Sequence, residues 1–118
     1  MSEFRTALEV RLLPENDGGP RWQLISPLVY YSDVMNREII VPIGFVSDFV
    51  SFCLLKNVGH RASVVHDWMY ESDVDRELAD KVLREALCVS GVPDELSEDM
   101  YLAVRLCGRR HKVNLHSL

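Results

Sequence analysis

The spacing of apolar residues changes about halfway along this chain, and that change constrains the fold more than any other feature. Three short apolar runs, at 7–13, 21–32 and 37–46, occupy the first half. Two turn-forming segments separate them, PENDGGP at 14–20 and DVMN at 33–36. Short strands joined by such turns are typical of a small antiparallel sheet or meander.

The second half follows helical spacing instead. A first helix is predicted over 60–71, and Ser72 with Asp75 has the character of a capping box that starts a second helix. The apolar residues of this second helix recur every three or four positions, at Leu78, Ala79, Val82, Leu83 and Ala86. Gly91 is a suitable residue for the second helix to end at.

A third helix is predicted to begin near Pro93, because proline fits the first turn of a helix. Its apolar stripe comprises Leu96, Met100, Ala103, Val104 and Cys107. Gly108 and the basic residues after it are expected to end this helix. Strands followed by helices indicate an α+β fold, in which about three N-terminal strands precede about three C-terminal helices.

Length and composition narrow the class of protein. The 118 residues fit a single domain over 1–118, with strands mainly in 1–50 and helices mainly in 60–112. The net charge of -5 argues against general binding to nucleic acid, which favours positive surfaces. The sequence shows no signal peptide and no membrane-spanning run. Its three cysteines, without disulfide or metal spacing, are expected to be buried free thiols, so a cytoplasmic protein is predicted.

The run VVHDWMY, at 64–70, holds two ionisable groups within an apolar segment. Adjacent helical residues point about 100° apart, so His66 is expected to face the interior and Asp67 the flank. An imidazole can act as a general base or a metal ligand near neutral pH. The alternative is a core histidine whose ring is bonded to a backbone carbonyl.

Other charged residues are candidates to join His66, each with a simpler alternative. Asp80 would lie opposite His66 if the first two helices form an antiparallel hairpin. The alternative is that Asp80 forms an ion pair with Arg76, which lies four residues before it on the same helix. Asp48 follows the last predicted strand, together with Ser51, and could instead start a turn. A basic cluster is interpreted as a solvated helix end, and comprises Arg105, Arg109, Arg110, His111 and Lys112.

Four segments in this order resemble small phage and prophage proteins of domain-of-unknown-function family 1353. The segments are GFVSDFVS, ASVVHDWMY, RELADKVLREAL and YLAVRLCG, within residues 44–108. The positions that match the family pattern include Asp48, His66, Asp67, Tyr70 and Asp80. Phe52, Cys53 and Leu54 depart from it, since the family has Val-Pro-Arg there. The resemblance implies a phage or prophage origin, and a location in the host bacterial cytoplasm or on the virion.

A weaker resemblance is to the active site of phospholipases A2. It implies that His66 is a general base, that Asp80 orients its ring, and that Tyr70 bonds within this catalytic pair. Asp67 would then be a calcium ligand, and Asp48 is a second candidate metal ligand. The Gly-rich calcium loop of those enzymes is missing from this sequence. Calcium or magnesium would suit the carboxylates, whereas zinc would suit a set with two histidines.

Two functions follow from these patterns. The first is a phage accessory protein that binds a host or virion protein and contains a buried His/Asp network at the strand-to-helix junction. The alternative is a small metal-assisted hydrolase that acts on a lipid, cell-wall or nucleotide ester. A catalytic site requires a carboxylate within about 3 Å of one ring nitrogen of His66 and access to the other.

Overall fold

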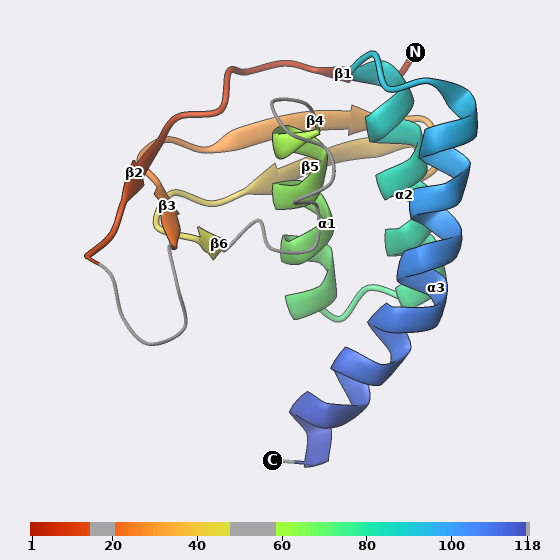
Figure 1. The fold of residues 1–118 in the computed structure, drawn as a ribbon. Helices are drawn as coiled ribbons and strands as arrows, with labels where there is room; N and C mark the ends of the chain where they lie inside the picture. The colour runs from red at the N-terminus through yellow and green to blue at the C-terminus, as the bar shows by residue number, and fades with distance from the viewer. Residues whose placement is uncertain (15–20, 48–58, 118) are drawn as a thin grey trace.

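The computed structural model describes residues 1–14, 21–47 and 59–117, and over 107–117 it describes the backbone alone. Strands precede helices in the described residues, which confirms the α+β class (Figure 1). The strands are β1 (Glu3–Phe4), β2 (Val10–Leu12), β3 (Trp22–Leu24), β4 (Leu28–Ser32), β5 (Arg37–Val41) and β6 (Val46–Ser47). The helices are α1 (His60–Glu71), α2 (Arg76–Val89) and α3 (Asp94–Ser117).

The strands form two antiparallel sheets where one small antiparallel sheet or meander was expected. One sheet has the order β1-β4-β5 and the other the order β2-β3-β6. The apolar run 21–32 is divided into β3 and β4 by a break at 25–27 that contains Pro27. The run 37–46 is divided into β5 and β6 by a break at 42–45 that begins with Pro42. Proline has no N–H to donate to a neighbouring strand, so each proline interrupts its run and lets the chain change sheets.

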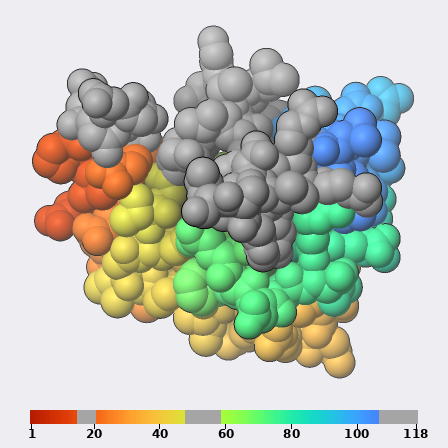
Figure 2. All heavy atoms as spheres, turned by 90° about the horizontal axis from the view of Figure 1, so that it is seen from below, coloured from red at the N-terminus to blue at the C-terminus, as the bar shows by residue number. Residues whose placement is uncertain are grey.

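The core lies between the β1-β4-β5 sheet and the helices. Strand β4 alternates strictly, so that Leu28, Tyr30 and Ser32 are buried on one face. Helices α1 and α2 cover this sheet, and α3 packs on α2 (Figure 1). In the space-filling view of Figure 2 the surface over the helices, green to blue, continues into the orange and yellow surface of the strands. The buried apolar residues of the strands and of the helices belong to one hydrophobic cluster, so both halves of the chain share one core.

The structure corrects three details of the sequence prediction. Asp75, not Ser72, is the N-cap of α2, where its carboxylate accepts from the Leu78 N–H at 3.1 Å. Ser72 bonds back to the end of α1 instead. Helix α3 continues through Gly108, because one glycine costs a helix only about 1 kcal/mol. Cys88 is a free thiol as expected, but it is exposed.

One predicted feature of the helical half is confirmed. Gly91 ends α2 with a φ of 94°, a conformation that glycine adopts without strain. Over the described residues no helix combines the length and the apolar character that crossing a membrane requires.

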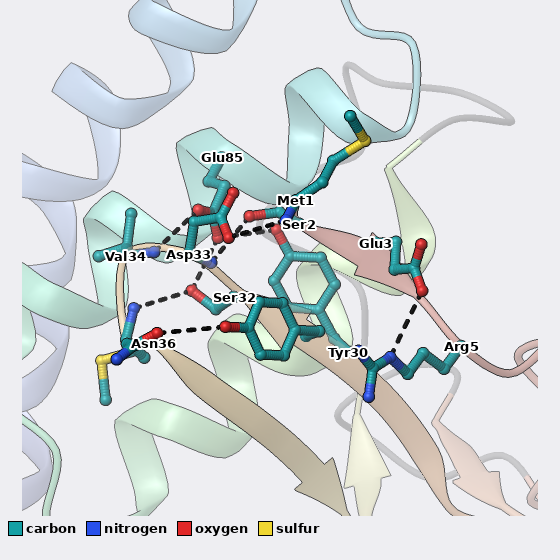
Figure 3. Close-up of polar contacts among 12 residues, drawn as sticks. Met1, Ser2, Glu3, Arg5, Tyr30, Ser32, Asp33, Val34, Asn36 and Glu85 are labelled. Carbon is teal, nitrogen blue, oxygen red and sulfur yellow. Dashed lines mark hydrogen bonds and ion pairs between the residues drawn. The ribbon is translucent and has the colours of Figure 1, made fainter.

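A carboxylate on α2 holds the end of β4 (Figure 3). One oxygen of Glu85 accepts hydrogen bonds from the hydroxyls of Tyr30, at 2.8 Å, and Ser32, at 2.7 Å. The other oxygen accepts from the backbone N–H of Val34 at 3.0 Å. Tyr30 and Ser32 are fully buried, so Glu85 supplies the acceptor that their hydroxyl protons need inside the fold.

Replacing Glu85 by alanine is expected to lower the free energy of unfolding by about 2 kcal/mol, because two buried hydroxyls and one N–H lose their acceptor. Urea unfolding monitored by circular dichroism measures this loss. The matched control is Glu71→Ala, at an exposed position at the end of α1, which is expected to change stability by less than about 0.5 kcal/mol. Equal losses in both variants would contradict the assigned role of Glu85.

Candidate functional site

The turn between α1 and α2 brings two polar helix faces together. His66 and Tyr70 are four residues apart on α1, so they project from the same side of that helix. Helix α2 runs back along α1 after the turn at 72–75 (Figure 1), and Asp80 lies on its inner side with no exposed surface. The predicted antiparallel hairpin therefore does place Asp80 opposite His66.

The central contact joins His66 to Asp80. His66 Nε2 lies 2.7 Å from Asp80 Oδ1, and the Tyr70 hydroxyl donates to the same oxygen at 2.6 Å. His66 is only 4% exposed, and its ring lies beside that of Tyr70 with 4.3 Å between centroids. An ionised carboxylate can only accept, so Nε2 carries a proton and donates it to Asp80. Asp80, and not a backbone carbonyl, is the partner of this nitrogen.

Arg105 of α3 is a fourth member of the network. Its Nη1 donates to Asp80 Oδ2 at 2.9 Å, and a quarter of its side chain is exposed. Arg105 therefore does not belong to the solvated basic cluster that its sequence suggests. Asp80 forms its ion pair with Arg105 rather than with Arg76, which donates to the backbone carbonyl of Arg105 at 3.3 Å. One feature of the sequence could have indicated this contact: Arg105 directly follows Val104 and so lies at the edge of the apolar stripe of α3.

The network sets the protonation states of its members. Burial acts to raise the pKa of Asp80, but hydrogen bonds from His66, Tyr70 and Arg105 outweigh it and hold the pKa below the ordinary value of 3.8. Burial, followed by the bond to Asp80, raises the pKa of the Tyr70 hydroxyl. At neutral pH Asp80 is therefore ionised and Tyr70 is neutral. An ionised aspartate behind an imidazole fixes its tautomer and stabilises its protonated form.

Comparison with known proteins places this arrangement in a family. The family model described as "Protein of unknown function (DUF1353)" matches residues 22–104. The chain belongs to the DUF1353 family. The matched region runs from β3 to α3 and contains three of the four network residues, while Arg105 directly follows it. No curated protein and no solved structure matches the chain.

The proposed metal ligands of this DUF1353 protein are only partly described by the structure. Asp67 is half-buried, as a flank position predicts, and accepts a hydrogen bond from Ser47 Oγ at 2.5 Å. Asp48 and Ser51 lie outside the described residues. Over the described ranges 1–14, 21–47 and 59–106, which include Asp67, no group of three or more His, Cys, Asp or Glu side chains is placed to hold a metal. Among the described residues, Asp67 on α1 is therefore the one predicted metal ligand that the structure shows.

Ser63 is a polar residue of α1 that the sequence reasoning did not single out. It is fully buried, and its hydroxyl has no hydrogen-bond partner within the described part of the chain. Ser63 precedes His66 by three positions and Asp67 by four, so helical geometry makes it a neighbour of both. Buried hydroxyls in native proteins nearly always have a partner. The Ser63 hydroxyl is therefore a buried polar group beside the network that takes part in none of the network's hydrogen bonds.

Proposed function

We propose that this DUF1353 protein hydrolyses an ester, with His66 as the general base. The observation that carries the proposal is the 2.7 Å contact between His66 Nε2 and Asp80 Oδ1. This contact fixes the imidazole and its tautomer, so Nδ1 is the nitrogen that would accept a proton from water. Tyr70 and Arg105 act as positioning residues, because both hold the Asp80 carboxylate.

In the proposed reaction His66 Nδ1 removes a proton from a water molecule as its oxygen attacks the ester carbon or phosphorus. The ionised Asp80 stabilises the imidazolium that forms, and the imidazolium then returns the proton to the departing alkoxide. The substrate class is a lipid, cell-wall or nucleotide ester. Asp67 and Asp48 are the residues that would hold a divalent metal, and such a metal would supply polarisation of the oxygen under attack.

A phage or prophage accessory protein that binds a host or virion protein is the second candidate. The bond from Arg105 to Asp80 favours it, since this bond extends the network across all three helices. A network that ties every helix together can specify packing without doing chemistry. In that case His66 and Asp80 would matter for stability alone.

A substrate screen tests the first candidate. The purified protein is incubated with phospholipid vesicles, peptidoglycan fragments, carboxyl esters and phosphodiesters, each with calcium, magnesium, zinc or a chelator. Hydrolysis of one class, in proportion to protein concentration and with saturation by substrate, is the expected result. A folded protein that leaves every class untouched under all metal conditions would contradict the hydrolase proposal. The accessory-protein candidate would then be pursued by a search for partners.

A further inference from the structure

The outward side of α3 is apolar at its centre. Leu102 is 50% exposed and Leu106 is 77% exposed, and Leu96 is 38% exposed nearer the start of the helix. Residues 102 and 106 are one helical turn apart, so their side chains form one patch. The opposite side of α3 is buried on the rest of the molecule, where Met100 and Val104 belong to the core. Helix α3 therefore has one face in the core and a second apolar face open to solvent.

The second half of α3 extends beyond the helix that supports its first half. Arg76, the first residue of α2, already contacts Arg105, and α3 continues to Ser117 (Figure 1). An isolated helical segment of this length is marginally stable in water. A partner packed along the helix would stabilise it.

The charge along α3 indicates what that partner is. The first turns are acidic, with Asp94, Glu95 and Asp99 beside a Glu98 that is already paired with Arg84, whereas the sequence at 109–112 is Arg-Arg-His-Lys. A second α3 running in the opposite direction would place the acidic half of each helix beside the basic half of the other. A parallel partner would place like charges together. Opposed helix dipoles also favour the antiparallel arrangement.

We propose that two copies of this chain associate through antiparallel α3 helices, with Leu102 and Leu106 at the centre of the contact. Such a contact is isologous, because both copies use the same patch across a twofold axis, so that every contact from a residue of one copy to a second residue of the other is repeated in reverse. One helix pair buries less surface than a standard interface, so a weak dimer is expected, with a dissociation constant on the order of micromolar.

Sedimentation equilibrium over a concentration series tests the proposal. The wild-type protein is expected to approach twice the 13.5 kDa of one chain as concentration rises. Leu106→Glu and Leu102→Glu are each expected to weaken association at least about tenfold, because they bury a charge at the centre of the contact. The matched control is Ile43→Glu, at a 62% exposed residue outside α3, which is expected to associate as wild type does.

A charge exchange tests the antiparallel direction. One variant combines Glu95→Lys with Asp99→Lys, and the other combines Arg109→Glu with Arg110→Glu. Each is expected to be monomeric alone, because both ends of its contact become repulsive, whereas an equal mixture is expected to form heterodimers. A wild-type protein that stays monomeric at millimolar concentration would overturn the proposal. The patch of Leu102 and Leu106 would then be a candidate binding site for a different protein. Dimers insensitive to these charges would overturn the antiparallel arrangement.

Discussion

Hydrolysis by the His66→Gln variant is expected to fall at least about a hundredfold, on whichever ester the wild-type protein cleaves. Glutamine cannot accept a proton from water, and general-base catalysis contributes about 10²–10⁴ in rate. The amide of the introduced glutamine has the reach to donate to Asp80, so the variant is expected to remain folded. The rate is measured under single-turnover conditions, and the melting temperature is measured on the same samples.

A second histidine of the same helix provides the control. His60→Gln lies at the exposed first residue of α1 and is expected to retain the wild-type rate. If His66→Gln also retained the wild-type rate, His66 would not be the base. If it lost activity only in proportion to a lost folded fraction, the accessory-protein candidate would gain support.

Replacing Asp80 by alanine is expected to lower the free energy of unfolding by about 3–5 kcal/mol. The change removes the one acceptor shared by His66, Tyr70 and Arg105, and leaves a cationic partner without its counter-charge. Chemical unfolding at neutral pH measures the loss. Asp73→Ala, in the exposed turn between α1 and α2, is the matched control and is expected to stay within about 0.5 kcal/mol of wild type.

The contribution of Asp80 also has a defined pH dependence. Its pKa in the folded protein is below the ordinary 3.8, so the folded state favours the ionised form more than the unfolded state does. The resulting stabilisation is fully present above 3.8 and is lost as the pH falls through the lower, folded-state pKa. Asp80→Asn is therefore expected to show a shallower loss of stability over this acid range. Parallel acid curves for both proteins would contradict the assigned role of Asp80.

The parts of the site that could be predicted from sequence are those set by local geometry. His66 and Tyr70 share a face because they are four residues apart, and one short turn brings Asp80 back to them. Arg105 could not be placed this way, since its contact depends on how α3 is rotated against α2. That rotation is fixed by packing along the whole length of both helices and not by neighbouring residues.

The same distinction holds for the fold. The order of strands and helices follows from periodicity, which is local. The division into two sheets depends on which strands pair across long stretches of sequence, as when β6 joins β3 and β1 joins β4. Glu85 was missed for a similar reason. Its role depends on which side of α2 faces β4, and an acidic residue among helical charges gives no sign of that.

Helix α2 carries one polar anchor toward the other helices, Asp80, and another toward the sheet, Glu85. They are five positions apart, and this spacing sets the two side chains about 140° apart around the axis. Inserting or deleting one residue between them would turn one anchor about 100° away from its partners. Over the course of evolution, we expect changes of chain length to accumulate before Arg76 or after Val89. The interval between the two carboxylates should keep a constant length across the family, even where the surrounding residues diverge.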